Sequence, residues 1–87
     1  LGPKDLRVIR VTDVSLLVEW EHVKKAEYYL LSYYPYGNEG AIQEIHVPKT
    51  EKSYLITHLK PGVTYIVQVK AVIKGISGES DHITATT

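Results

Sequence analysis

Histidine and serine are the residues of this 87-residue chain best suited to metal binding or nucleophilic catalysis. The four histidines, His22, His46, His58 and His82, lie too far apart for the i,i+2 or i,i+4 pairs typical of metal sites. None of the serines stands in the Gly-x-Ser-x-Gly turn that exposes a nucleophile. Cysteine is absent, which excludes disulfides and cysteine-based zinc sites. We therefore expect no catalytic residue, no metal and no cofactor, and no enzymatic activity.

Charge is balanced, with 10 Lys and Arg against 10 Asp and Glu. A nucleic-acid binder needs a basic surplus, and no apolar run approaches the roughly 18 residues of a membrane span. Glu27 and Glu51 interrupt the lysines, which favours a solvated surface over a heparin site. The lysines weighed for such a site are Lys24, Lys25, Lys49, Lys52 and Lys60. The single asparagine, Asn38, is followed by Glu39 and Gly40, so we expect no N-glycosylation.

Short apolar runs that alternate with polar residues, separated by Gly, Pro and Asp turns, predict an all-β sandwich or barrel. The abundance of Tyr, Val, Ile and Thr also favours strands. The segment His22–Ala26 is too short and too poorly capped for a helix, so we interpret it as a loop. Seven strands are predicted: Asp5–Arg10, Ser15–Glu21, Glu27–Tyr34, Ile42–Val47, Ser53–Thr57, Thr64–Ile73 and Asp81–Thr86.

The period of two in a pleated strand predicts which side chains face the core. Trp20 is the largest apolar group, and its burial would stabilise the fold by a few kcal/mol. Leu59, Pro61-Gly62 and Tyr65 predict a corner between two sheets, with the Tyr65 hydroxyl bonded to backbone a few residues upstream. The inward residues expected are Leu6, Val8, Leu16, Val18, Trp20, Tyr29, Leu31, Tyr33, Ile45, Val47, Tyr54, Ile56, Tyr65, Val67, Val69 and Ala71.

Together these residues resemble a fibronectin type III domain over nearly the whole chain. The resemblance is carried by Pro3, Leu6 and Val8, by Trp20, by Tyr29-x-Leu31-x-Tyr33, and by Leu59-x-Pro61-Gly62-x-x-Tyr65-x-Val67-x-Val69. It implies an immunoglobulin-like, seven-stranded antiparallel sandwich. One sheet would hold the first, second and fifth predicted strands, and the other would hold the third, fourth, sixth and seventh. Immunoglobulin domains differ because they carry a cysteine where this chain has Val67.

Within that family the chain is most similar to the repeats of tenascins, in the opening Pro3–Leu6, in Leu59–Tyr65 and in the ending Ala85–Thr87. The resemblance implies a secreted, non-catalytic binding and spacer module of an extracellular matrix glycoprotein that functions in cell adhesion. We expect residues 1–87 to be one domain excised from a longer chain, monomeric when isolated and flanked by similar domains. The alternatives are a spacer in the ectodomain of a signalling receptor, in an intracellular muscle-type array, or beside a bacterial glycosidase.

Two surfaces are candidates for contact with another protein. On the outward face of Glu27–Tyr34 and Thr64–Ile73, apolar residues interrupt the polar pattern that is usual there. The loop Lys74–Ser80 lacks the Arg-Gly-Asp of some family members, which disfavours integrins that require that motif, but places Ile76 at an exposed tip. The weighed alternatives are a sheet face covered by its neighbours and a plain flexible loop. The candidate contact residues are Tyr28, Leu30, Tyr34 and Ile66 on the face, and Lys74, Gly75, Ile76 and Ser77 in the loop.

Overall fold

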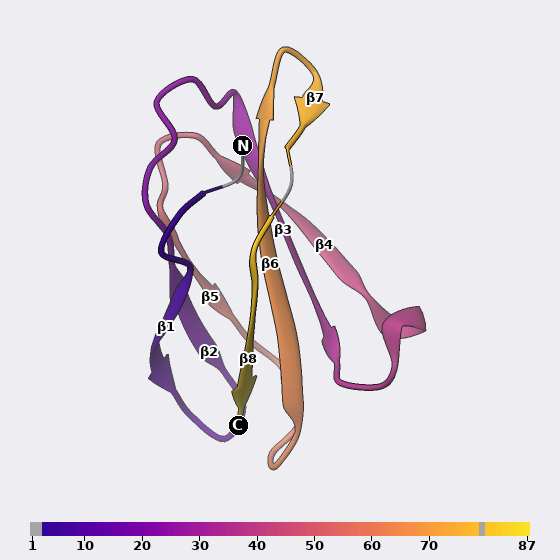
Figure 1. Cartoon of the computed structure of the whole chain (residues 1–87). Helices are drawn as coiled ribbons and strands as arrows, with labels where there is room; N and C mark the ends of the chain where they lie inside the picture. Colours follow the sequence, from indigo (N-terminus) through magenta and orange to yellow (C-terminus); the bar gives the residue numbers. More distant parts are fainter. Residues whose placement is uncertain (1–2, 79) are drawn as a thin grey trace.

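A computed structural model describes residues 3–78 and 80–87 of the chain (Figure 1). Gly2 and Glu79, which belong to turns expected from the sequence, lie outside these residues. A short 3-10 turn, η1, spans Glu39–Ala41. The strands are β1 (Arg7–Val11), β2 (Leu16–Glu19), β3 (Tyr28–Pro35), β4 (Gln43–Pro48), β5 (Ser53–Ile56), β6 (Thr64–Ile73), β7 (Ile76–Ser77) and β8 (His82–Thr86).

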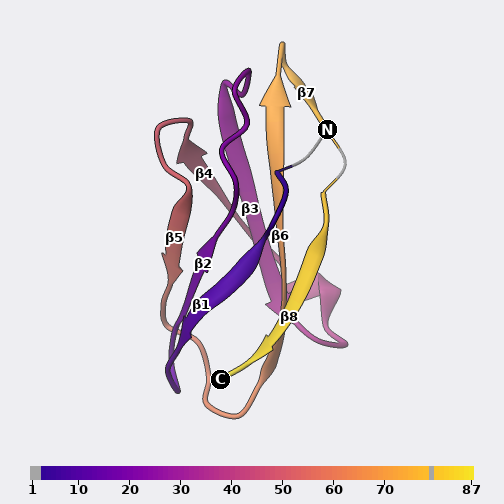
Figure 2. The ribbon, with the colours of Figure 1, turned by 60° about the vertical axis from the view of Figure 1, so that its left-hand side comes forward.

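The strands form two antiparallel sheets that pack face to face (Figures 1 and 2). One sheet has the order β1-β2-β5; the other has the order β4-β3-β6-β7, with β8 also paired to β6. The predicted sandwich and its division of strands between sheets are therefore confirmed. No helix within the described residues has the length and apolar character needed to cross a membrane.

Strand boundaries differ from the prediction where the backbone turns. Asp5 has a φ of 55°, a left-handed conformation that interrupts an extended strand, so β1 begins at Arg7. At the other end of the chain, β6 pairs first with β7 and then, beyond Gly78, with β8. The sequence predicted neither the two-residue β7 nor the 3-10 turn, because elements this short carry no periodicity.

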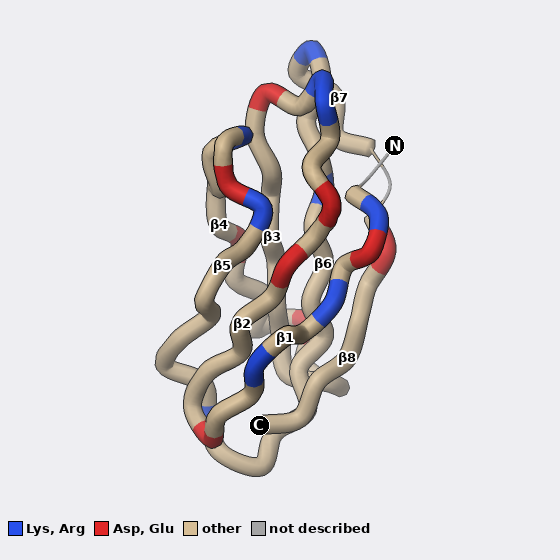
Figure 3. The backbone as a smooth tube through the Cα atoms, turned by 90° about the vertical axis from the view of Figure 1, so that its left-hand side faces the viewer, with Lys and Arg blue, Asp and Glu red and all other residues tan. Residues whose placement is uncertain are grey.

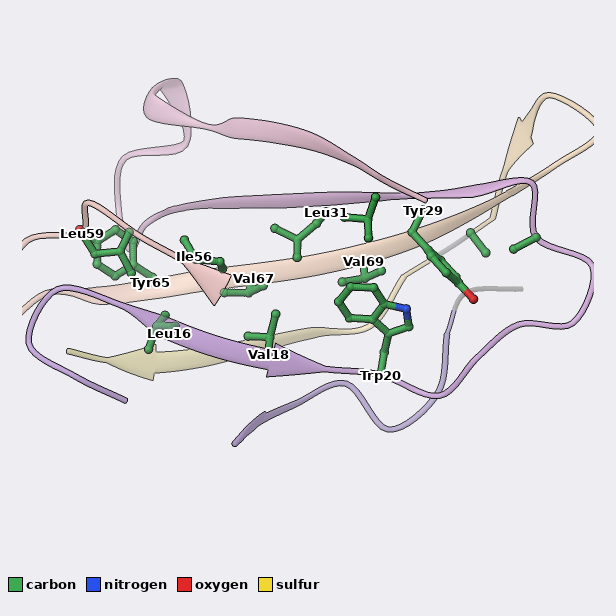
Figure 4. Packing of buried hydrophobic residues seen from close by; sticks show 13 residues of the cluster. Leu16, Val18, Trp20, Tyr29, Leu31, Ile56, Leu59, Tyr65, Val67 and Val69 are labelled. Carbon is green, nitrogen blue, oxygen red and sulfur yellow. The ribbon is translucent and has the colours of Figure 1, made fainter. Parts of the chain in front are cut away.

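The core fills the space between the sheets, and most residues predicted to face inward are buried there (Figure 4). Leu16 and Val18 of β2, and Trp20 directly after the strand, alternate inward and are fully buried. Five predicted inward residues are only partly buried and pack against the margin of the core: Leu6, Val8, Tyr33, Ile45 and Tyr54. Period-two alternation correctly assigned the faces, but it did not show how far each side chain lies from the edge of the sandwich.

Trp20 anchors one half of the core. Its ring centroid lies 5.4 Å from that of Tyr29, with an interplanar angle of 66°. The indole Nε1 is buried and has no hydrogen-bond partner among the described residues. In Figure 4 the nitrogen edge of the indole points toward the Tyr29 ring. The two rings therefore pack in the edge-to-face arrangement that aromatic pairs prefer.

Two tyrosine hydroxyls tie loops to the core, one at each end of the sandwich. Lys60 N donates to the Tyr65 hydroxyl at 2.9 Å, which confirms the predicted tyrosine corner. Val23 N donates to the Tyr29 hydroxyl at 2.8 Å. The second contact was not predicted, because it depends on how the β2–β3 loop folds back over β3. Each ring is therefore buried while its hydroxyl oxygen accepts a hydrogen bond from a backbone N–H group.

The described chain begins and ends at opposite poles of a molecule 37 Å long (Figure 1). Glu21 N donates to Lys4 O at 2.8 Å, which holds the first residues beside the β2–β3 loop. At the other pole Thr87 N donates to Val63 O at 3.0 Å, beside the β5–β6 corner. Backbone bonds thus fix the first and last residues to separate ends of the sandwich.

Candidate protein-contact surfaces

The sheet face predicted as a contact surface lies on the solvent side of β3 and β6. Cross-strand pairing brings Leu30 opposite Lys70 and Tyr34 opposite Ile66, and it places Tyr28 opposite Val72. The register therefore makes residues of the two strands neighbours, as expected from the outward faces that alternation gives and the strand pairing that the family resemblance implies. We call Tyr28, Leu30, Tyr34 and Ile66 the sheet-face patch.

Neighbouring side chains cover much of the sheet-face patch. Its four residues are each partly buried rather than exposed. His46 of β4 stacks on Tyr28, with ring centroids 4.5 Å apart and an interplanar angle of 15°. Val72 follows Ile66 in the outward alternation of β6, which predicts exposure, but it is only 2% exposed because Tyr28 and Ser77 pair with it from both sides. The weighed alternative of partial cover by β4 is supported at the Tyr28 end.

The hairpin between β6 and β7 is tighter than the predicted flexible loop. Ile73 pairs with Ile76, which leaves Lys74 and Gly75 as a two-residue turn with φ values of 53° and 74°. Positive φ at both central residues is the type I′ pattern, which matches the twist of antiparallel strands. Glycine suits the second position because it has no Cβ. The connection is shorter than the predicted loop because Ile76 and Ser77 pair with β6 and extend the sheet.

A carboxylate from the β2–β3 connection holds this hairpin in place. Gly75 N donates to Glu27 Oε1 at 3.0 Å, across 48 positions of sequence. Ile76, next in the chain, is 72% exposed. The turn therefore presents Lys74 and Ile76 on a backbone that is bonded to Glu27, a contact that no local sequence pattern predicts.

The largest exposed apolar side chains lie outside the sheet-face patch. Ile76 belongs to a candidate surface, but the others were not singled out from the sequence. Hydrophobic periodicity does not distinguish an apolar residue on an edge strand or in a loop from one in the core. Those with nearly half or more of their surface exposed are Ile9, Val11, Val14, Tyr36, Ile42, Leu55 and Ile76.

The histidines take separate positions. His22 Nε2 lies 3.1 Å from Lys49 O, and His46 stacks on Tyr28. His58 has a φ of 62° and contacts the Thr57 hydroxyl through Nδ1 at 3.0 Å. Within residues 3–78 and 80–87, no three His, Cys, Asp or Glu side chains group closely enough to hold a metal ion.

Charged residues of both signs alternate over the surface. Figure 3 shows basic positions along β1 beside acidic positions at and just beyond the end of the neighbouring β2. Arg7 and Glu19, paired across these strands, form an ion pair with side chains 50% and 25% exposed. Lys60, in the β5–β6 corner, lies at the opposite pole from the other lysines weighed for heparin, which the β2–β3 and β4–β5 loops carry (Figure 1).

Tyr33 lies at the margin of the core near the β5–β6 corner. Burial raises the pKa of Tyr33, and the nearby Tyr54 and Tyr65 raise it further. The ring lines a hollow with His58, Lys60 and Tyr65 at this pole. The neutral phenol is thus the form that the folded structure favours.

Comparison with known proteins gives concordant matches. The model of the fibronectin type III domain matches residues 2–86. Tenascin-N of Mus musculus is 46% identical over 87 residues, and tenascin-N of Homo sapiens is 44% identical over 85 residues. These alignments cover 100% and 98% of this chain but 6% of each relative, so the chain spans a small part of their length.

Similarity extends to another tenascin and to a solved structure. Tenascin of Gallus gallus is 36% identical over 72 residues, covering 83% of this chain and 4% of that protein. The solution structure of the fn3 domain of the human collagen alpha-1(XX) chain has a TM-score of 0.89 and 25% identity. That match covers 100% of this chain and 84% of the other.

Proposed function

Since the chain belongs to the fibronectin type III family, we propose that it is a binding and spacer module of an extracellular matrix glycoprotein, acting in cell adhesion. The family is one of non-catalytic structural modules, so the expectation that the chain is not an enzyme is confirmed. The observation that carries the proposal is the 46% identity to tenascin-N over 87 residues. The proposed location is therefore outside the cell, in the matrix.

The spacer role is supported by the fixed positions of the chain ends. Lys4 and Thr87 are held by backbone bonds at opposite poles. The module would therefore keep its two attachment points apart along the 37 Å axis and transmit force between them. We propose that residues 1–87 form one domain of a longer chain with neighbouring fibronectin type III domains attached at these poles. Such an array would separate its binding sites by a fixed length per module.

The binding role is proposed for the sheet-face patch and for the β6–β7 turn. Both combine apolar surface with cations, since Lys70 lies opposite Leu30 and Lys74 precedes the exposed Ile76. The proposed partners are matrix proteins and cell-surface receptors, including integrins that do not require Arg-Gly-Asp. The residues proposed to contact them are Tyr28, Leu30, Tyr34 and Ile66 on the sheet, and Lys74, Gly75, Ile76 and Ser77 in the turn.

A cell-attachment assay on surfaces coated with the isolated domain tests this proposal. Attachment should be measured with and without divalent cations and with an integrin-blocking antibody, which separates integrins from other receptors. The variants are Leu30→Ser with Ile66→Ser for the patch and Ile76→Ser for the turn. Ile42→Ser is the matched control, because Ile42 is 49% exposed and lies outside both surfaces.

We expect at least one of the two surface variants to reduce attachment while the control does not. Circular dichroism and thermal unfolding establish that each variant retains the fold. Equal attachment by folded wild type and by both variants would refute the assignment of these surfaces. An absence of attachment to the wild-type domain would refute direct cell binding and leave the spacer role.

A further inference from the structure

β5 is an edge strand whose outer side is free. It pairs with β2 on one side, and no described strand pairs with it on the other (Figure 2). Its residues, Ser53–Ile56, include no charge and no proline, and their register with β2 has no bulge. Soluble proteins usually protect such edges with charges, proline, bulges or a covering segment, because an open edge can pair with another strand.

The three longer edge strands of the described structure, β1, β4 and β8, have such protection. β1 carries Arg7 and Arg10 and has an irregular register between Val8 and Arg10. β4 carries Glu44 and ends at Pro48. β8 runs beside β1 of the opposite sheet (Figure 2). β5 is therefore the edge at which a further strand meets the least obstruction.

The hydrogen-bond pattern identifies which backbone groups point outward from β5. Trp20 N donates to Lys52 O at 2.9 Å, so the opposed pair Trp20 and Lys52 is a hydrogen-bonded one. Such pairs alternate along an antiparallel ladder, which assigns the N–H and C=O groups of Tyr54 and Ile56 to β2. The groups of Ser53 and Leu55, and of Thr57 directly after the strand, point to the free edge.

We propose that this edge pairs with β5 of a second copy of the chain, antiparallel and centred on Leu55. In that register Leu55 faces Leu55 of the second copy, and Ser53 faces Thr57. Each of these opposed pairs joins outward-pointing groups, so each forms two backbone hydrogen bonds. A two-fold axis relates the copies, which makes the contact self-complementary and closed. This inference does not depend on the proposed adhesive function.

The side chains around Leu55 fit this register. Leu55 is 49% exposed and lies opposite Leu17 within its own sheet. Pairing would join Leu17 and Leu55 of both copies into one apolar row on the solvent face of a continuous six-stranded sheet. On the inner face, the partly buried Tyr54 would gain Ile56 of the second copy as a neighbour. Between Ser53 and Thr57 no like charges are opposed.

The contact is small, so the association is expected to be weak. About five residues a side is well below the roughly 20 to 30 of a standard interface. We therefore expect the 87-residue domain to be a monomer at low micromolar concentration and to form dimers as its concentration approaches ~1 mM. The sequence led us to expect a monomeric isolated domain, and the proposed dimer departs from that expectation only at the upper end of this concentration range.

The test combines sedimentation equilibrium with amide hydrogen exchange over a concentration series. In the wild type, the Ser53, Leu55 and Thr57 amides should become protected as concentration rises, whereas Tyr54 and Ile56 should be protected throughout. Leu55→Pro removes an amide that the β2–β5 ladder leaves unbonded among the described residues, and proline is tolerated where an edge N–H faces solvent. It should weaken association at least about tenfold, since the central pair of bonds is lost.

Leu55→Lys is the second variant, in case the proline alters the fold, and it should weaken association by like-charge repulsion. Ile76→Lys is the matched control, because Ile76 is 72% exposed but lies in the other sheet. A monomer at ~1 mM would overturn the proposal. Dimers that persist in both folded Leu55 variants, or that are lost equally in the control, would also overturn it, because they would indicate pairing elsewhere or unspecific apolar association.

Discussion

Removing the Tyr65 hydroxyl isolates the energy of the tyrosine corner. In Tyr65→Phe the ring remains buried, but Lys60 N loses its acceptor at 2.9 Å. A hydrogen bond contributes a net ~0.5–1.5 kcal/mol, and an unsatisfied buried donor costs ~1–3 kcal/mol. Because Lys60 itself is exposed, water replaces part of the lost bond, so we expect a loss of about 1–2 kcal/mol in the free energy of unfolding.

Urea unfolding at constant m-value measures this loss directly, and thermal unfolding should show Tm falling by roughly 4–16 °C for a domain of this size. Tyr36→Phe is the control, because Tyr36 is 73% exposed and its stability contribution should be negligible. Tyr29→Phe, which removes the acceptor for Val23 N at 2.8 Å, should cost a similar amount. If Tyr65→Phe unfolds like the wild type, the corner bond does not stabilise the fold and the reasoning is refuted.

Three further perturbations test other parts of the structure. Trp20→Ala should lower the free energy of unfolding by about 3–5 kcal/mol, because the indole is fully buried. A variant with the same Tm as the wild type would contradict the place of Trp20 in the core. Gly75→Ala should cost about 1 kcal/mol in urea unfolding through backbone strain alone, since φ is 74° and no atom lies within 4 Å of the added Cβ; an unchanged midpoint would argue against the type I′ turn. The raised pKa of Tyr33 means that the unfolded chain releases the proton first. The contribution of the neutral Tyr33 to the free energy of unfolding should therefore be fully present below the ordinary tyrosine pKa of about 10, and it should be lost as the pH rises through the higher pKa of the folded state. Tyr33→Phe should lessen this loss.

The fold was largely predictable because its strands alternate with few exceptions. Leu16, Val18 and Trp20 occupy every second position of β2 and the residue that follows it, and a pleated chain sends such residues to one face. The corner was predictable for the same local reason, since Pro61-Gly62 specifies a turn and Tyr65 opens the strand after it. Sheet membership came from the family resemblance, because alternation identifies faces but does not identify neighbours.

The candidate surfaces were only partly predictable. Alternation placed Tyr28, Leu30 and Ile66 on the outward face, and the register confirms that residues from both strands meet there. It did not predict the stacking of His46 on Tyr28, which depends on the alignment of β3 with β4. It also gave no indication that Glu27 bonds to Gly75, since 48 positions separate them.

The sequence by itself determined what each strand buries, because the period of the backbone and the polarity of the side chains are local properties. Tertiary structure alone decided how much of each outward side chain is exposed and which strand edges keep unpaired backbone groups. Leu55 and Ile56 are adjacent apolar residues of β5, yet Leu55 is 49% exposed and Ile56 is 1% exposed. Alternation predicted that Ile56 faces the opposing sheet and Leu55 faces solvent, but only the assembled sheets show that β5 has a single neighbour among the described strands. Exposure and free backbone groups depend on which strands lie alongside, and that is settled only when the two sheets assemble.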